Sequence, residues 1–389
     1  MRIRGFARLL AALAAACAIV LTVAACGSSD DDGGDSASTT SGGGAATAPA
    51  DSGLPAEVTD AVREFTTRPT SIGIDVPVRG RVPAGKEIYY IQCGSPVCAT
   101  NGEYLRAAAE TVGWKVKAIN AGVTPESVKA AWAQAAQDKP DGVVASGFPR
   151  TMMNPELAEL EQARVPVVDI SVTDPPGRGI SAVFAGTPDY VAAGDRLAKY
   201  ALVDAGGKDI KAMIVGVAAY PTVQLVGRSF GDTLKRYCDS CSVDELDVPA
   251  TSIGNDLPTR ISTYLQAHPD VNWVVNGFAD MSVGVPAALK SAGVGDGVKF
   301  VGINNNPTTA GYLKAGQSVV AEHIYGYPEL MWRSVDFLIR SINGESTDPS
   351  TAQTYPHWVV TKDTIPSTTD EFPTVVDYRE QYERLWGVG

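Results

Sequence analysis

Basic residues and histidines are scarce in this chain. Its 389 residues include 32 Lys and Arg against 44 Asp and Glu, a net charge of −12, and only three His. Phosphate backbones and anionic lipid surfaces repel such an acidic chain, so we expect no nucleic-acid partner. No His, Cys and carboxylate cluster has the spacing of metal ligands, and we expect neither a metal nor a cofactor. Hydrophobic residues make up 44% of the chain, enough for the cores of a globular protein.

The first 26 residues have the layout of an export signal. Three arginines precede an apolar run at 9–26, and small and acidic residues follow it directly. The run is long enough to span a membrane, so a retained N-terminal anchor is the alternative. Its end, Val-Ala-Ala-Cys, resembles a bacterial lipobox, which implies that residues 1–25 are removed and that Cys26 carries a lipid. We therefore expect an extracytoplasmic lipoprotein, anchored to the outer face of the bacterial cell membrane. Loss of the three arginines lowers its net charge from −12 to −15.

Composition divides the chain that remains. Residues 26–53 are almost all small or polar, which predicts a flexible tether because such a segment cannot bury enough apolar surface to become ordered. Residues 54–85 form an N-terminal arm, with a short helix at 55–65 and then an extended segment containing three prolines. We expect the arm to lie over the first domain. The length of the processed chain indicates two domains.

Four cysteines remain besides Cys26 and the one in the signal. They form two close pairs, Cys93 with Cys98 and Cys238 with Cys241, and in an exported protein such pairs predict disulfides. The second pair also matches a redox C-x-x-C motif. That chemistry needs the N-terminus of a helix, whereas this motif follows a helical stretch. A zinc site of four thiolates would require the two pairs to meet across the fold.

From residue 86 the pattern alternates short apolar strands with helices. This predicts two α/β lobes, each a doubly wound parallel sheet covered by helices on both faces. The predicted strands are 87–92, 114–119, 142–146 and 165–170 in the first lobe, and 211–217, 242–248, 271–276, 299–303, 318–323 and 358–360 after it.

Four segments then occur in a characteristic order: KPDGVV at 139–144, RVPVVD at 164–169, HPDVNWV at 268–274 and FVGIN at 300–304. With the order of the elements, they resemble the periplasmic-binding-protein type I family, in its sugar-binding lipoprotein branch, over about residues 86–345. The resemblance implies a monomeric, non-enzymatic solute receptor for an ABC importer, with the permease and its ATPase as partners. It also implies lobes formed by 86–187 plus 327–345 and by 188–326 plus 346–389, joined by a hinge that the chain crosses three times. A receptor that partners a membrane sensor instead of a transporter is the alternative.

Ligands of parallel α/β sheets bind beyond the carboxyl ends of the strands, so the candidate site comes from residues at these ends. Each candidate also has a structural explanation. The phenylalanines could pack beneath a loop, the aspartates could cap a helix, the asparagines could form only a turn and a cap, and the arginine could be a solvated surface charge. The candidate ligand-binding residues are Gln92, Cys93, Asn101, Phe148, Arg150, Asp169, Ser171, Tyr220, Asn276, Phe278, Asp280, Asn304 and Tyr325.

The chain departs from the family's sugar-binding pattern at several of these positions. The family places charged or amide groups near Ser171, Val226, Phe278, Asn304 and Gly326, where this chain has mostly neutral or apolar side chains. A buried polyol needs a partner for each hydroxyl, at a cost of about 1–3 kcal/mol for each one left unpaired. Carbohydrate remains the solute that the family implies, and an aromatic or less polar solute is the alternative.

Two further motifs lead to hypotheses. The loop 93–98 lies where this family contacts its ligand, and a disulfide would make it a rigid wall of the cleft. The segment 227–231 matches the G-x-S-x-G motif of serine hydrolases by its letters. That motif needs the serine on a sharp turn directly after a strand, whereas Ser229 falls inside a helical pattern, so a hydrolase is only a remote alternative.

Overall fold

The computed structural model describes residues 53–389, except 95, 123, 353–354 and 371. The predicted signal, Cys26 and all but the last residue of the tether lie outside the described residues. The described residues have hydrophobic cores of their own, so a chain that begins at residue 43 should fold without the first 42 residues. In the described part of the chain, no helix is both long and apolar enough to cross a membrane.

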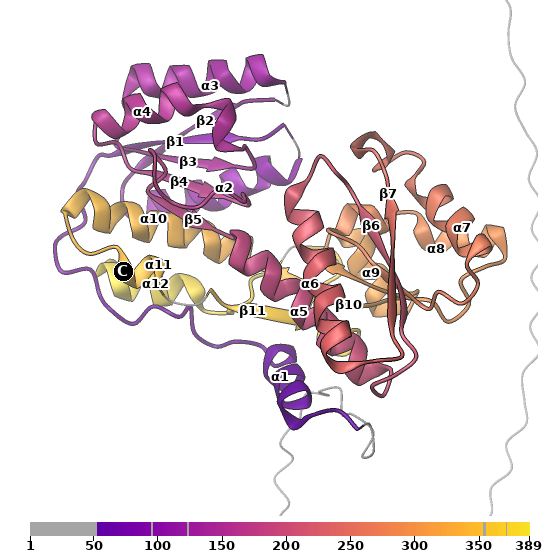
Figure 1. The fold of residues 1–389 in the computed structure, drawn as a ribbon. Helices are drawn as coiled ribbons and strands as arrows, with labels where there is room; N and C mark the ends of the chain where they lie inside the picture. Colours follow the sequence, from indigo (N-terminus) through magenta and orange to yellow (C-terminus); the bar gives the residue numbers. More distant parts are fainter. Residues whose placement is uncertain (1–52, 95, 123, 353–354, 371) are drawn as a thin grey trace, which may run out of the picture. The chain divides into compact units, whose positions relative to one another are not determined.

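The first sheet has five parallel strands in the order β2-β1-β3-β4-β5 (Figure 1). Alternate side chains of its strands point to opposite faces. Tyr89 and Ile91 pack with helices α3 and α4, whereas Ile88 and Tyr90 pack with α2 and α10. The bounds are β1 Glu87–Gln92, β2 Lys115–Asn120, β3 Gly142–Ser146, β4 Val167–Ile170, β5 Ala182–Phe184, α2 Pro96–Thr111, α3 Pro125–Asp138, α4 Asn154–Gln162 and α10 Tyr327–Asn343.

The second sheet has six strands in the order β11-β10-β9-β8-β6-β7, and only β11 is antiparallel to its neighbour. The same alternation divides its core: Met213 and Val215 pack with α7, α8 and α9, whereas Ala212 and Ile214 pack with α5 and α6. The bounds are β6 Lys211–Gly216, β7 Ser242–Asp247, β8 Trp273–Val275, β9 Lys299–Ile303, β10 Val319–Tyr325, β11 His357–Val360, α5 Thr187–Asp204, α6 Pro221–Tyr237, α7 Leu257–Ala267, α8 Val285–Ala292 and α9 Pro307–Ala315.

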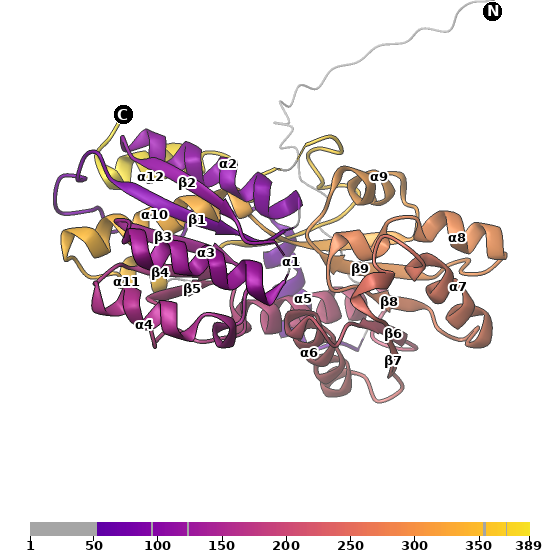
Figure 2. The same ribbon diagram turned by 90° about the horizontal axis from the view of Figure 1, so that it is seen from above.

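Two sheets, each with helices on both faces, confirm the predicted fold class. The chain passes between them three times: from β5 to α5, from β10 to α10, and from the end of α10 to β11 (Figure 2). Strand β5 was not predicted, because three residues are too few to show a strand pattern.

The arm and the C-terminal tail correct the sequence-based assignment. Helix α1 (Ala56–Thr66) packs against α5 and β11, not against the first lobe, and only the part near Val76 to Pro83 reaches α10 and Trp114. Helix α12 (Tyr378–Trp386) was expected with the second lobe but packs against α10, where Trp386 stacks on Trp332 with 5.3 Å between ring centroids. The arm and the tail pair with each other, since Arg68 donates hydrogen bonds to the carbonyls of Pro373 and Thr374.

Candidate functional site

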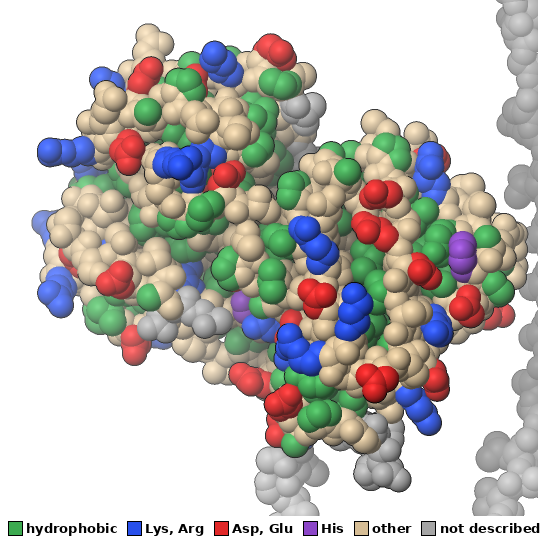
Figure 3. All heavy atoms as spheres, in the orientation of Figure 1, with side chains coloured by type: hydrophobic (Ala, Val, Ile, Leu, Met, Phe, Trp, Pro, Cys, Tyr) green, Lys and Arg blue, Asp and Glu red, His purple; other side chains and the backbone are tan. Residues whose placement is uncertain are grey.

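The carboxyl ends of the strands in both sheets lie at the junction of the lobes. Strand β5 ends at Phe184, and α5 of the second lobe begins three residues later. Strand β10 ends at Tyr325, and α10 of the first lobe begins two residues later. Such short connections require both carboxyl edges to be close to the other lobe. The surface is indented between the two lobes (Figure 3).

The loop after β1 contains the first disulfide, which joins Cys93 to Cys98. Helix α2 begins at Pro96, so Cys98 belongs to its first turn. The Sγ atom of Cys98 lies 3.6 Å from the hydroxyl of Ser146 at the end of β3. The disulfide thus ties the end of β1 to α2, and Cys98 contacts the end of β3 beside it.

One turn further along α2, Asn101 is buried, and its Oδ1 atom has no hydrogen-bond partner among the described residues. Gln92, the last residue of β1, is half-buried. Phe148, after β3, is buried in the core beside α3 and α4.

Arg150 and Asp169 are packed into the first lobe. Arg150 is buried, which contradicts the surface-charge alternative: its side chain donates to the carbonyl of Pro175, and its backbone N–H donates to Asp174 at 2.8 Å. Asp169 lies inside β4 and therefore caps no helix. Its Oδ1 atom accepts from the N–H of Ile170 at 3.0 Å, whereas Oδ2 has no partner among the described residues.

Burial raises the pKa of Asp169 to about 8, the nearby carboxylate of Asp174 adds to this rise, and the hydrogen bond from Ile170 and the charge of Arg150 oppose it. Asp169 is therefore mostly a neutral acid at pH 7. Ser171, just after β4, has a left-handed backbone with φ of 60°, which turns the chain sharply at the lobe junction.

In the second lobe, Tyr220 follows β6 and Phe278 follows β8, and the two form an aromatic pair. Tyr220, just before α6, is 41% exposed, and its ring meets that of Phe278 edge to face with 6.1 Å between centroids. Asn276 follows β8 and is fully buried. It donates to the hydroxyl of Ser282 at 2.7 Å, whereas its Oδ1 atom has no partner in the described part of the chain.

The asparagines after β9 form the turn and the helix cap considered from the sequence, and they also make hydrogen bonds to other segments. Asn306 caps α9, and its side-chain amide also donates to the carboxylate of Asp280 at 2.7 Å. Asp280 therefore holds the capping residue in place and does not itself cap a helix. Asn304 has a left-handed backbone with φ of 57°, and its Oδ1 atom accepts from the N–H of Tyr325 at 3.0 Å. Asn304 therefore connects β9 to the crossing that follows β10.

Tyr325 belongs to the hinge. It is buried between Tyr190 and His323, whose ring centroids lie 5.4 and 4.9 Å away. His357, at the start of β11, completes this cluster, with its ring centroid 5.2 Å from that of His323. Burial lowers the pKa of both histidines well below the usual value, and nearby charges lower it further. No local sequence pattern predicts this cluster, because its members come from three separate elements.

Ser229 lies in the middle of α6, and its hydroxyl donates to the carbonyl of Val191 in α5 at 2.6 Å. Helices α5 and α6 approach closely here, since a Cβ atom on Gly194 would lie 2.4 Å from the carbonyl oxygen of Val226. Gly227 lets α6 approach the sheet, since a Cβ atom on it would lie 2.5 Å from Ile214 of β6. The G-x-S-x-G letters therefore describe a helix-packing contact, not a nucleophile on a turn.

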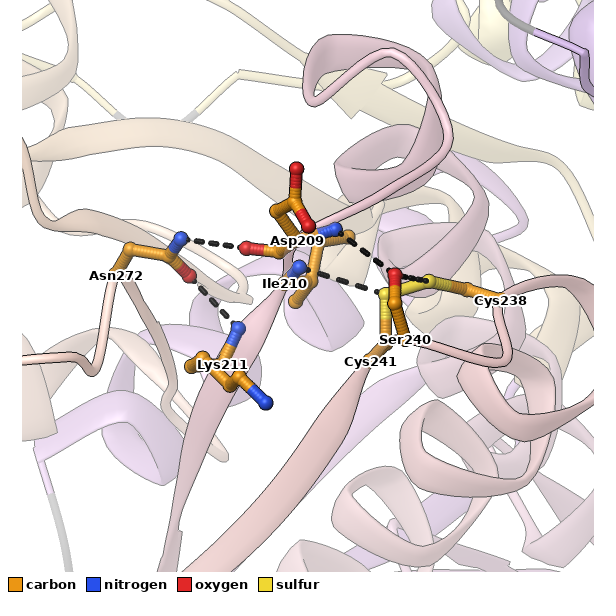
Figure 4. Close-up of a disulfide and its surroundings, with 7 residues drawn as sticks. All are labelled: Asp209, Ile210, Lys211, Cys238, Ser240, Cys241 and Asn272. Carbon is orange, nitrogen blue, oxygen red and sulfur yellow. Dashed lines mark hydrogen bonds between the residues drawn. A yellow bond between two sulfur atoms is a disulfide. The ribbon is translucent and has the colours of Figure 1, made fainter.

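The second disulfide, Cys238 to Cys241, lies at the C-terminal end of α6, where the helix dipole does not favour a thiolate (Figure 4). The N–H of Ile210 points at the Sγ atom of Cys241 at 3.4 Å, just before β6 begins. This bond therefore fastens the amino edge of the second sheet, opposite the carboxyl edge where the candidate site lies. Both pairs are closed as the sequence predicted, and neither is left to bind zinc. Within the described ranges, no group of three His, Cys, Asp or Glu side chains could hold a metal ion.

Two lobes with the carboxyl edges of parallel sheets at their junction define a two-lobed ligand-binding protein. The family model for the periplasmic binding protein domain matches residues 92–345, and the chain belongs to this family of extracytoplasmic binding proteins. A comparison with curated proteins found no match.

Several solved structures share the fold. GanP, a glucose-galactose binding protein from Geobacillus stearothermophilus, has 21% identity and a TM-score of 0.63, over 73% of this chain and 100% of that one. A periplasmic ribose ABC transporter protein from Conexibacter woesei has 17% identity and a TM-score of 0.64, over 74% of this chain and 95% of that one. XylFII in its complex with LytSN has 17% identity and a TM-score of 0.61, over 73% of this chain and 100% of that one.

Proposed function

We propose that the protein is a lipoprotein that captures a small solute between its lobes outside the cytoplasm and delivers it to an ABC importer. The main support is a set of buried polar atoms near the strand ends that have no partner among the described residues. It includes Oδ1 of Asn101 and Oδ2 of Asp169 in the first lobe, and Oδ1 of Asn276 and Nδ2 of Asn305 in the second. A buried polar atom without a hydrogen bond costs about 1–3 kcal/mol. A solute or waters bound between the lobes would remove this cost, and hinge closure would bury the solute.

Carbohydrate is the solute class that the comparisons favour, because the similar structures include glucose-galactose, arabinose and ribose proteins. The site also suits a less polar solute. Asp169 is mostly uncharged at pH 7 and Arg150 is turned to the carbonyl of Pro175, whereas Tyr220 and Phe278 offer aromatic surface. A thermal-shift screen of residues 43–389 decides between the classes, because a solute at a hundredfold excess over its Kd adds about 2.7 kcal/mol of stability. Protection by a sugar or polyol would support the first class, and protection only by small aromatic compounds would support the second.

The proposed partners are a permease with its ATPase, and a lipid on Cys26 would keep the receptor at the membrane. The alternative is that another membrane protein senses the closed form. A complex of XylFII with LytSN, a protein with this fold bound to a second protein, makes that alternative concrete. Reconstituted transport with a permease supports the first proposal, whereas ligand-dependent binding to a sensor supports the second.

Replacing Tyr220 with alanine should weaken binding of the solute found in the screen by about tenfold, because an exposed aromatic side chain at the lobe junction loses its contact with the ligand. Isothermal titration measures the loss. Tyr264→Ala is the matched control, because Tyr264 lies in α7, away from the junction, and stacks on His268 just after that helix. Equal affinities of the two variants would remove Tyr220 from the site.

Replacing Cys93 and Cys98 together with serine should weaken solute binding more than replacing Cys238 and Cys241. Without the first disulfide, the loop after β1 must be ordered when the ligand binds, at about 0.5–1.5 kcal/mol for each immobilised side chain. The second pair is at the opposite edge of its sheet and serves as the control. Equal small losses of affinity in both double variants would contradict the role of the first disulfide as a rigid wall.

A further inference from the structure

A cavity of about 810 Å³ lies between the arm and the second lobe. It is lined by α1, by residues 67–70 of the arm, by one face of α5 and by His357 at the start of β11. None of the strand-end residues of the candidate solute site lines it. The cavity therefore belongs to the hinge and the arm, separate from the solute site.

Four basic and three acidic side chains line this cavity, and the carboxylate of Asp189 lies 3.6 Å from His357 of the lining. Arg63 pairs with Asp60 at 3.0 Å, and Lys199 pairs with Asp195 at 2.7 Å. Arg68 and Arg196 also line the cavity, and no carboxylate of the described residues lies within ion-pair distance of either guanidinium. The remaining acid of the lining, Glu64, is exposed.

The two arginines are held in place by other groups. Arg68 donates to the carbonyls of Pro373 and Thr374, and its guanidinium lies 4.9 Å from the centre of the Trp358 ring. Nη1 of Arg196 lies 3.4 Å from Nε2 of His323 in the hinge. A partly buried cation without a counterion costs free energy, and the planar donors of arginine match the oxygens of phosphate and carboxylate.

His357 supplies an independent observation. Its side chain is only 5% exposed, it lines the same cavity, and its Nδ1 atom has no hydrogen-bond partner in the part of the chain that the structure describes. Its Nε2 atom lies 3.6 Å from the carboxylate of Asp189. An oxyanion in the cavity would accept from Nδ1 in the tautomer that carries the proton there, and it would give both guanidinium groups a partner.

We propose that this cavity is a second binding site, for an oxyanion of the phosphate type held by Arg196 and Arg68. The proposal does not depend on the identity of the solute. The net charge of −12 repels anions in general, so binding would have to come from the two guanidinium groups that have no carboxylate partner among the described residues. The anion would contact α1, α5 and β11, which connects the arm that follows the tether to two of the three hinge crossings. It could be free phosphate or the phosphate of a lipid headgroup.

Thermal unfolding of residues 43–389 in increasing inorganic phosphate, at constant ionic strength, tests the proposal. Phosphate should raise the Tm of the wild type. The apparent affinity should fall by about tenfold or more in Arg196→Gln, because charge-assisted hydrogen bonds are lost. Arg228→Gln removes an exposed arginine of α6 and should behave as the wild type. Phosphate also stabilises proteins without binding to them, so an equal shift in all three proteins would overturn the proposal.

A second variant works even if Arg196→Gln folds poorly. Ala192 lines the cavity one turn before Arg196, so Ala192→Glu would place a carboxylate four residues before the arginine, the favourable arrangement for an ion pair. This variant should have a raised Tm without phosphate and no phosphate shift, and an unchanged shift would contradict the site. Vesicles of phosphatidylglycerol, compared with phosphatidylcholine, identify the source of the anion. Protection by phosphate assigns a free oxyanion, protection only by the anionic vesicles assigns a lipid headgroup, and protection by neither overturns the proposal.

Discussion

Replacing Asp336 with alanine should destabilise the protein by about 3–5 kcal/mol, because it would leave a buried arginine without its counterion. Asp336 lies in α10 and is fully buried. Three groups donate hydrogen bonds to the carboxylate of Asp336. They are the guanidinium of Arg340 at 2.9 Å, the hydroxyl of Ser350 at 2.6 Å and the indole N–H of Trp386 at 2.9 Å.

This carboxylate holds together segments that are far apart in the sequence. Ser350 lies in α11 (Asp348–Thr351), Trp386 lies in α12, and Arg340 also donates to the carbonyl of Val76 in the arm at 2.6 Å. Loss of Asp336 should therefore loosen the tail and the arm together from α10.

Urea denaturation of residues 43–389 measures the effect. Asp60→Ala is the control, since Asp60 and Arg63 form an ion pair with both side chains more than 60% exposed. Such pairs contribute about 0–1 kcal/mol. If Asp336→Ala cost no more than Asp60→Ala, the buried network would not support the packing of α10, α11 and α12.

Much of the fold could be predicted from the sequence, because strands buried on both faces leave unbroken apolar runs. Val143 and Val144 point to opposite faces of β3, and both are fully buried, so the run needed no alternation to indicate a strand. The place of the candidate site followed from the same strands, because a parallel sheet presents its carboxyl edge to a ligand.

What each side chain does at that edge could not be predicted. Arg150 and Asp280 have the chemistry of ligand-binding groups, yet the partners of both lie more than 20 residues away, in the turn at 174–175 and at Asn306. Local sequence gives no information about contacts of that separation. The tail shows the same limit: the stacking of Trp386 on Trp332 depends on tertiary packing that no periodicity encodes.

Replacing Asp169 with asparagine should remove a large pH dependence of the stability. The pKa of Asp169 is about 8 in the folded protein, because the carboxyl is fully buried, against a reference value of 3.8. Between these values the unfolded chain loses the proton and the folded protein keeps it. The wild type therefore loses about 1.4 kcal/mol of stability for each unit that the pH rises through this window. The stabilising contribution is complete below about pH 4 and is lost as the pH passes 8.

The test compares the slope of stability with pH, not its level. Any packing cost of the amide is the same at every pH. The free energy of unfolding of Asp169→Asn should therefore rise relative to that of the wild type by nearly 3 kcal/mol between about pH 5 and 7. The buried histidines act in the opposite direction: their lowered pKa makes the protein lose stability as the pH falls below about 6.5. Both proteins contain them, so their effect cancels in the difference.

Glu322 provides an independent repetition, since burial in β10 raises its pKa to about 8 as well and Glu322→Gln should diverge in the same direction. Parallel pH profiles of the wild type and Asp169→Asn would mean that Asp169 ionises in the folded protein near its reference pKa. Asp169 would then carry a negative charge beside the lobe junction at pH 7, and the solute site would favour cationic or hydroxyl-rich ligands. A divergence of the expected size instead leaves the first lobe without that charge, which favours a neutral solute.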